Sequence, residues 1–288
     1  TVASYNLRNA NGSDSAKGNG WGQRYPVIAK MVQYHDFDIF GTQECFIHQL
    51  KDMKEALPGY DYIGVGRDDG KEKGEHSAIF YRTDKFDVIE KGDFWLSETP
   101  DVPSKGWDAV LPRICSWGHF KCKDTGFEFL FFNLHMDHIG KKARVESAFL
   151  VQDKMKELGK GKELPAILTG DFNVDQTHQS YDAFVSKGVL CDSYEKAGFR
   201  YAINGTFNDF DPNSFTESRI DHIFVSPSFQ VKRYGVLTDT YRSIVGKGEK
   251  KQANDCPEEI DIKTYQARTP SDHFPVKVEL EFDQRQQK

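Results

Sequence analysis

The stretch Leu168-Thr169-Gly170-Asp171-Phe172-Asn173 places a carboxylate and an amide close together at the end of an apolar run. The run from Leu164 to Leu168 predicts a buried strand, and we expect the chain to turn at Gly170, because glycine lets the backbone bend. Alternation then puts Asp171 and Asn173 on the same side. A carboxylate can orient a water and an amide can donate to an anionic oxygen, which suits phosphate chemistry. These residue types are also common in ordinary turns, so the stretch alone leaves both readings open.

Polar side chains recur at the ends of other predicted apolar strands. The full set is Asn6, Glu44, Glu75, Arg113, His135, Asp171, Asn173, Asp221, Asp272 and His273. One such residue is most often a solvated or satisfied side chain, but a set spread along the chain predicts one mouth where strand ends converge. Carboxylate oxygens there suit a hard cation such as Mg²⁺, and no Cys/His set favours zinc.

Arg113 to Lys121 and Phe127 to Met136 give the clearest hairpin pattern, with 123–126 as the turn. Counting outward from the turn places Arg113 opposite His135 to within about one residue. The second strand is apolar on both faces, so this sheet should be covered on both sides. A lone strand histidine is usually a core residue, whereas an arginine beside it favours an anion site.

No linker divides the 288 residues, so we expect one domain over 1–288. The segment around 240–266 has clustered Lys and Glu without a clear period, which predicts a surface insertion. Apolar content of 38% supports a sizeable core, and the formal charge of -6 argues against a broad basic face for duplex nucleic acid. No apolar run is long enough to span a membrane, and we expect a monomer.

The 5 cysteines are odd in number and lack zinc-like spacing, so mostly free thiols are expected. The chain opens at Thr1 without Met and enters a strand-like run at once. Removal of an N-terminal signal, and hence export of a soluble protein, is one interpretation, and the compartment stays open.

Short segments along the whole chain resemble, in this order, the motifs of the endonuclease/exonuclease/phosphatase (DNase I-like) superfamily. They are Ser4-Tyr5-Asn6, Thr42-Gln43-Glu44, Asn133-Leu134-His135, Gly170-Asp171-Phe172-Asn173, Arg219-Ile220-Asp221 and Ser271-Asp272-His273. Gly106-Trp107-Asp108 before Arg113, with Ala143-Arg144, is similar to an uncharacterised bacterial branch near the deadenylase-like members. The resemblance implies an α/β fold, a four-layer α/β/β/α sandwich of two mixed β-sheets flanked by helices.

The resemblance also implies a metal site. Glu44 is the expected principal ligand of Mg²⁺, with Mn²⁺ as an alternative ion. Asn6 and Asp272 are expected close to the metal.

The remaining matches imply catalytic and phosphate-binding roles. Asp171 is expected to activate or orient water, and His273 is the expected catalytic histidine, oriented by Asp221. Glu75 matches a carboxylate that supports His135, which is itself expected to act in catalysis. The expected phosphate contacts are Asn173, Arg113 and His135.

These features predict Mg²⁺-dependent hydrolysis of a phosphoester by in-line attack of water, as a nuclease-like phosphodiesterase. The alternative is a phosphatase of small sugar, inositol or lipid-headgroup phosphates, so the partner is either single-stranded nucleic acid or a small phosphate. A second alternative is a non-catalytic phosphate-binding scaffold, because a fold does not by itself imply an activity.

Overall fold

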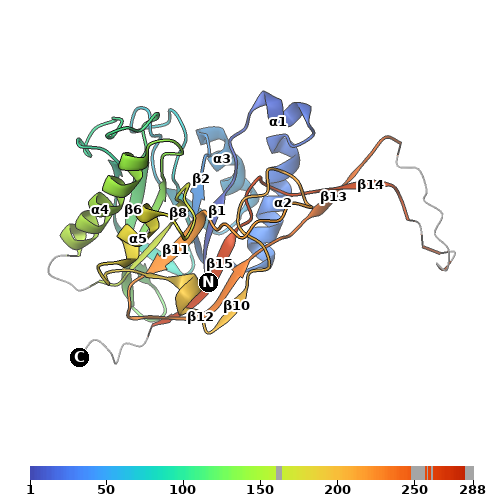
Figure 1. Ribbon diagram of the computed structural model, residues 1–288. Coiled ribbons are helices and arrows are strands. Elements are labelled where there is room, and N and C mark those ends of the chain that lie inside the picture. The colour runs from blue at the N-terminus through green and yellow to red at the C-terminus, as the bar shows by residue number, and fades with distance from the viewer. Residues whose placement is uncertain (160–163, 248–256, 258, 261, 283–288) are drawn as a thin grey trace.

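The computed structural model describes residues 1–159, 164–247, 257, 259–260 and 262–282, and two large sheets pack face to face in this part of the chain (Figure 1). The first sheet has, in spatial order, β10 (Phe199–Tyr201), β12 (Phe229–Val236), β15 (Val276–Phe282), β1 (Val2–Asn6), β2 (Ile39–Gln43), β4 (Ile79–Arg82) and β3 (Tyr60–Ile63). The second has β5 (Phe86–Trp95), β6 (Ile114–Cys122), β7 (Glu128–His135), β8 (Ala166–Asp171), β11 (Asp221–Val225) and β9 (Cys191–Asp192).

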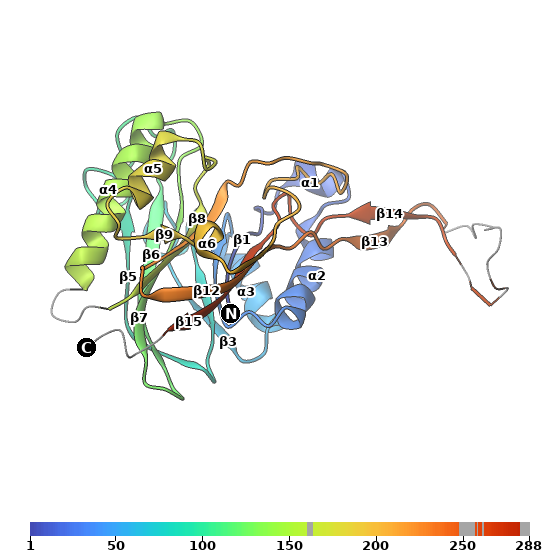
Figure 2. The same ribbon diagram turned by 60° about the horizontal axis from the view of Figure 1, so that its bottom comes forward.

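Helices cover the outer faces of both sheets. The helices are α1 (Gly12–Ala16), α2 (Trp21–Tyr34), α3 (Ile47–Ala56), α4 (Lys141–Leu158), α5 (Gln179–Val185) and α6 (Ser193–Lys196). In Figures 1 and 2, α4 and α5 lie on the second sheet, and α2 and α3 lie on the first. The predicted four-layer α/β/β/α sandwich is confirmed.

Side-chain alternation along β7 explains why its sheet is apolar on both faces. Phe129 and Phe131 belong to the core between the two sheets. Leu130, Phe132 and Leu134 belong to the core beneath α4 and α5. The predicted hairpin is present, with Cys115 paired to Leu134, so Arg113 lies one residue away from the position opposite His135.

Strand directions bring the polar ends to one edge of the sandwich. β1 runs parallel to β2, and β7 runs parallel to β8 with His135 beside Asp171. β11 is antiparallel to β8 and starts with Asp221 opposite Asp171. β15 is antiparallel to β1, so the chain before it returns to the end of β1 near Asn6. Parallel strands that end here therefore meet antiparallel strands that begin here.

The expected turn at Gly170 is wrong. β8 continues through this glycine to Asp171, and the positive φ of 51° falls at Asn173 instead. A Cβ at Gly170 would lie 2.5 Å from the carbonyl oxygen of Leu134. Glycine is needed here because β7 and β8 approach closely, and the reversal that presents the amide is made by Asn173, a residue type that tolerates left-handed backbone.

Below the mouth, a buried polar cluster joins the two sheets. Asn133 on β7 donates from Nδ2 to the carbonyl oxygens of Thr42 at 2.8 Å and Ala78 at 3.0 Å. Its Oδ1 accepts from Gln43 Nε2 at 2.7 Å and Thr169 Oγ1 at 3.0 Å. We call Asn133, Gln43, Thr42 and Thr169 the intersheet polar cluster. Most of these groups are paired with one another, although Gln43 Oε1 has no hydrogen-bond partner, so a polar contact between two apolar layers is tolerated and fixes how the sheets align.

The ends of the predicted insertion at 240–266 form a two-stranded ribbon. β13 (Tyr241–Ile244) pairs with β14 (Tyr265–Arg268), and the ribbon projects beyond α2 (Figures 1 and 2). Residues 248–256, 258 and 261 of that segment lie outside the described part of the chain. The assignment of a single domain with one insertion stays a prediction.

Cys45, Cys115, Cys122 and Cys191 are free thiols, as expected, and Cys256 lies outside the described residues. Among the helices that the structure describes, none combines the length and the apolar character needed to cross a membrane.

Candidate active site

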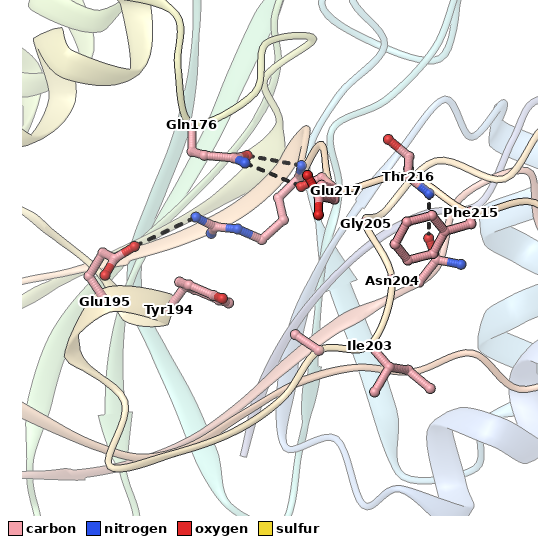
Figure 3. Close-up of a pocket in the computed structure, with 11 residues that line it drawn as sticks. Gln176, Tyr194, Glu195, Ile203, Asn204, Gly205, Phe215, Thr216 and Glu217 are labelled. Atoms are coloured by element: carbon pink, nitrogen blue, oxygen red, sulfur yellow. Dashed lines mark hydrogen bonds and ion pairs between the residues drawn. The ribbon is translucent and has the colours of Figure 1, made fainter.

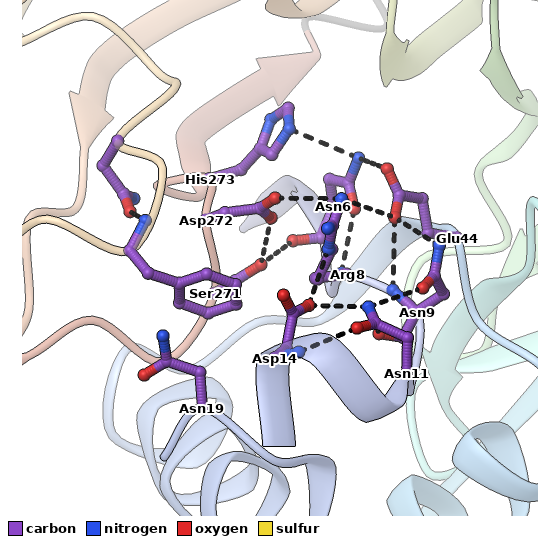
Figure 4. Close-up of polar contacts among 12 residues, drawn as sticks. Asn6, Arg8, Asn9, Asn11, Asp14, Asn19, Glu44, Ser271, Asp272 and His273 are labelled. Atoms are coloured by element: carbon purple, nitrogen blue, oxygen red, sulfur yellow. Dashed lines mark hydrogen bonds and ion pairs between the residues drawn. The ribbon is translucent and has the colours of Figure 1, made fainter. Parts of the chain in front are cut away.

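The amide of Asn6 links the two sheets at the centre of the mouth. Its Nδ2 donates to Asp171 Oδ2 at 2.9 Å and to Glu44 Oε1 at 3.1 Å, and lies 3.5 Å from His273 Nε2. Figure 4 shows Asn6 between Glu44 and His273. Asn6 comes from the first sheet and Asp171 from the second, so this hydrogen bond sets the distance between them.

Glu44 stands just after β2 with a left-handed backbone, φ 65°. Its Oε2 accepts from the backbone nitrogen of Asn9 at 3.2 Å and from Asn9 Nδ2 at 3.1 Å. A left-handed backbone is unfavourable for glutamate, and these contacts help to hold the carboxylate in place.

The donor set at this position fits a divalent cation. Glu44, His135 and Asp171 each offer one ligand atom, and these atoms lie within 4.8 Å of one another. Carboxylate oxygens suit Mg²⁺, and an added imidazole nitrogen is also compatible with Mn²⁺. In this arrangement the Asn6 amide bridges two of the three residues.

Asp272, the other expected neighbour of the metal, faces a guanidinium. Its Oδ2 lies 3.4 Å from Arg8 Nη1, and the same nitrogen lies 3.9 Å from Glu44 Oε2 (Figure 4). Arg8 Nε also donates to Asp14 Oδ2 at 2.9 Å. A cation shared by Glu44 and Asp272 would therefore compete with Arg8 for the same oxygens.

A fully buried arginine fixes the backbone of the two segments that carry Asn6 and His273. Arg24 on α2 donates from Nη1 to the carbonyl oxygens of Leu7 at 2.7 Å and Pro270 at 3.1 Å. Its Nη2 donates to the carbonyl oxygen of Arg8 at 3.1 Å. Ser271 Oγ adds a 2.7 Å hydrogen bond to the carbonyl oxygen of Asn6. Arg24 on α2 thus holds the segment after β1 against the segment before β15.

His273 and Asp221 are hydrogen-bonded. His273 Nδ1 lies 2.8 Å from Asp221 Oδ2, and its Nε2 lies 3.8 Å from Asp171 Oδ2. Burial disfavours the charged ring, but the carboxylates of Asp221 and Asp171 outweigh burial and raise the pKa of His273 well above its usual value. Burial and the charge of Asp221 raise the pKa of Asp171. The site therefore combines a charged imidazolium with a carboxylate of increased basicity.

His135 has the opposite character. Burial and the nearby guanidinium groups of Arg113 and Arg67 lower the pKa of His135 well below its usual value. Its Nε2 lies 3.1 Å from Asn173 Nδ2 and 3.5 Å from Asp171 Oδ2, while its buried Nδ1 has no hydrogen-bond partner. Glu75 Oε2, the expected support, is 3.9 Å from that Nδ1 and accepts instead from Arg67 Nη1.

A cavity of 230 Å³ opens beside these groups. Its lining residues are Arg8, Asn9, Glu44, Arg67, Glu75, Leu111, Arg113, His135, His138 and Asn173. Arg113 donates from Nε to Asp137 Oδ1 at 3.2 Å, and its Nη2 lies 3.0 Å from His138 Nδ1. The cavity therefore has several cationic groups on its wall and carboxylates at one side.

The predicted residues lie in two neighbouring groups. The first group is centred on the Asn6 amide and contains Glu44, Asp171, Asp221, Asp272 and His273. The second group lines the cavity and contains Glu75, Arg113, His135 and Asn173. Sequence reasoning missed Arg8, Asn9 and Arg67. Arg8 follows a strand end by two residues, which is a usable signal, whereas Arg67 lies in a charged loop that gives none.

A four-layer sandwich that gathers carboxylates, imidazoles and amides at one edge places the chain in the class of DNase I-like α/β folds. The model of the Endonuclease/Exonuclease/phosphatase family matches residues 3–273, and the chain belongs to this family. Members of the family are hydrolases that act on phosphoesters.

Among similar proteins, a mannosyl-6-phosphatase from Bacteroides thetaiotaomicron is 86% identical, with a TM-score of 0.91, and the match covers 98% of this chain and 99% of that one. An uncharacterised protein of Acanthamoeba polyphaga mimivirus is 30% identical over 91% of this chain and 92% of its own length. The human Nocturnin catalytic domain, 17% identical with a TM-score of 0.67 over 98% of this chain and 93% of that one, shares the fold.

Proposed function

We propose that this protein is a divalent-metal-dependent phosphatase that removes phosphate from O6 of a mannosyl residue. The cavity of 230 Å³ walled by Arg8, Arg67 and Arg113 carries the proposal. The similar protein named mannosyl-6-phosphatase supports the choice of sugar. The nuclease-like phosphodiesterase expected from the sequence is the competing activity.

The charge of the cavity wall favours a phosphate monoester. A terminal phosphate carries close to two negative charges at neutral pH, with a second pKa of about 6, whereas a bridging diester carries one. Arg113 is only 3% exposed and Arg67 9% exposed, so solvent screens them little. Arg67 is paired with Glu75 and Arg113 with Asp137, so a phosphate would be held by the three guanidinium groups together with the bound cation. The volume is also below the roughly 300 Å³ at which sites for drug-sized ligands begin, which suits a terminal phosphate.

The proposed reaction uses the residues of the site as follows. Asp171 orients a water and takes its proton as the water oxygen bonds to phosphorus. The bond from phosphorus to sugar O6 breaks, the sugar oxygen takes up a proton from solvent, and Asp171 later releases its proton to solvent, so the products are the free hydroxyl and inorganic phosphate. His273 in its charged form and the Asn173 amide donate to the phosphoryl oxygens as negative charge builds.

Glu44, His135 and Asp171, whose ligand atoms lie within 4.8 Å of one another, would hold the divalent cation, and the Asn6 amide donates to the two carboxylates. When bound, the cation supplies positive charge to the phosphoryl oxygens. Arg113 and Arg67 supply the remaining positive charge from the protein.

The test compares a monoester with diesters under identical Mg²⁺. Mannose 6-phosphate is expected to release inorganic phosphate with a kcat/KM at least roughly a hundredfold above that for bis-p-nitrophenyl phosphate or single-stranded RNA. Arg67→Gln should reduce this preference, while Arg82→Gln, which alters a partly exposed arginine paired with Asp36 and Asp84, should preserve it. Faster cleavage of either diester by the wild-type protein would favour the phosphodiesterase.

A further inference from the structure

We propose that a second cavity beside the active site binds neutral sugar residues of the glycan that carries the phosphate. The inference rests on the proposed function and extends its substrate from a sugar phosphate to a phosphorylated oligosaccharide. The cavity measures 410 Å³ and is lined by α6, by the segment between α6 and β11, and by Gln176, which precedes α5 (Figure 3). We call it the loop cavity. Its lining residues are Gln176, Tyr194, Glu195, Ala202, Ile203, Asn204, Gly205, Phe215, Thr216, Glu217 and Arg219.

The loop cavity presents rings at a largely polar wall. Phe215 is 72% exposed and Ile203 is 61% exposed, so both offer apolar surface at the rim. Tyr194 also lines the cavity (Figure 3), but Arg219 at 3.8 Å and Arg200 at 4.6 Å lie over its ring, so Phe215 is the ring that a ligand would contact. An apolar face beside hydrogen-bonding groups matches a sugar ring, which has C–H groups on its faces and hydroxyls at its edge.

The charges of the wall exclude a phosphate. Among the described lining residues, Arg219 is the only cation, and it is already engaged by Asp192 at 3.0 Å and by the ring of Tyr194 at 3.8 Å. Glu195 and Glu217 are both exposed and add negative charge. This balance repels an anion such as a nucleic-acid backbone and suits neutral hydroxyl groups.

The loop cavity is preformed by hydrogen bonds within the loop. Asn204 donates from Nδ2 to the carbonyl oxygen of Ser214 at 2.8 Å and accepts from the backbone nitrogen of Thr216 at 3.0 Å. Gln176 Nε2 donates to the carbonyl oxygen of Glu217 at 3.2 Å (Figure 3). A site whose walls are already ordered loses less entropy when a ligand binds.

The same loop leads directly to the catalytic histidine. Gly205 lines the loop cavity, and two residues later the ring of Phe207 lies 5.2 Å from the ring of His273, edge-on. Between them, Thr206 Oγ1 accepts from the backbone nitrogen of Asp221 at 3.1 Å. Two residues span at most about 7 Å, so a sugar chain attached to the phosphorylated residue can reach the loop cavity within a few sugar units.

The kinetic test uses mannose 6-phosphate and a mannose trisaccharide phosphorylated at O6 of its terminal residue. For the wild-type protein, KM for the trisaccharide should be roughly tenfold lower than KM for the monosaccharide. Phe215→Ala should raise the KM for the trisaccharide, relative to the KM for mannose 6-phosphate, roughly fivefold to tenfold, because it removes the rim ring. Phe199→Ala, a matched change of a ring that is 61% exposed but outside the loop cavity, should leave the ratio unchanged.

A binding test without catalysis separates this inference from the proposed function. Saturation-transfer NMR with unphosphorylated mannotriose should show binding to the wild-type protein and to Phe199→Ala, and its loss in Phe215→Ala. No transfer to the wild-type protein, or equal transfer to all three, would overturn the loop cavity as a glycan site. Absence of mannose 6-phosphate hydrolysis would instead overturn the proposed function, whatever the NMR shows.

Discussion

Burial and nearby charge shift the pKa of His273 in opposite directions. Burial lowers this pKa, whereas the carboxylates of Asp221, 2.8 Å away, and of Asp171 raise it, and the carboxylates outweigh burial. His273→Ala should lower kcat by roughly 10² to 10⁴ and leave Tm nearly unchanged, because the ring contacts the transition state in the proposed reaction. Steady-state kinetics and calorimetry measure the two effects. If Tm falls so far that unfolding alone explains the lost activity, His273 is a structural residue instead.

Asp221→Asn tests the same pair through pH. Because the carboxylate raises the pKa of His273, the amide should let the ring lose its proton at lower pH. The alkaline limb of the kcat/KM profile should therefore move to lower pH. An alkaline limb at the same pH in both proteins would show that another group titrates there.

Arg8 makes a prediction about metal affinity. Its guanidinium lies 3.4 Å from Asp272 and 3.9 Å from Glu44, where it competes with a cation. Arg8→Met should tighten Mn²⁺ binding roughly threefold to tenfold, with the gain limited by solvent screening. Calorimetric titration measures it, with Arg82→Met as the control. Weaker binding in Arg8→Met would mean that Arg8 orders the ligands.

At the scale of elements, the intersheet polar cluster fixes how the two sheets align beneath the mouth. A Cβ at Gly41 on β2 would lie 2.2 Å from both Asn133 Oδ1 and Thr169 Oγ1. Gly41→Ala should lower the free energy of unfolding by roughly 1–3 kcal/mol, because it overpacks the core and strains these hydrogen bonds.

Urea unfolding measures the effect of Gly41→Ala. Gly22→Ala on α2 is the matched control, because nothing lies within 4 Å of its added Cβ. The control should be neutral or stabilising by up to about 1 kcal/mol. Equal unfolding midpoints for wild-type protein and Gly41→Ala would show that the sheets separate easily.

The sequence was sufficient for most elements. The hairpin strands expected over Arg113 to Lys121 and Phe127 to Met136 appear as β6 and β7, within one residue of the predicted bounds, because alternation is a local signal. The turn at Gly170 was misplaced, since a glycine required by a neighbouring strand looks the same as one required by a bend. Arg67 could not be anticipated, because its contact with Glu75 depends on how a loop folds back against the sheet.

The site was also partly predictable, since Asn6, Asp171 and His273 end or precede strands whose directions place them together. Strand-end patterns identify which residues meet and not which way each side chain turns. Asp272 illustrates this limit. The resemblance implies a place near the metal, which stays a prediction, and the structure shows its carboxylate turned toward Arg8 at 3.4 Å.

For the whole molecule, a bound cation should stabilise the folded state, since the ligand atoms of Glu44, His135 and Asp171 converge only there. At a free Mg²⁺ concentration of about 100 times Kd, the gain should be about 2.7 kcal/mol, which raises Tm by several degrees. Differential scanning fluorimetry with Mg²⁺ and then EDTA measures it. Glu44→Gln should lose most of this response, and an equal rise in Tm in the variant would place the cation elsewhere.

The contacts of Arg24 determine which positions of the chain can tolerate substitution. It donates to the backbone oxygens of Leu7, Arg8 and Pro270, so these contacts do not read the side chains at those positions. Selection on this contact falls on the donor alone, and its acceptors exist in every amino acid. In a saturation library selected for folding and activity, position 24 should accept almost no replacement, while position 7 tolerates apolar exchange. One position near the start of α2 thus fixes a backbone contact whose acceptors any sequence would supply.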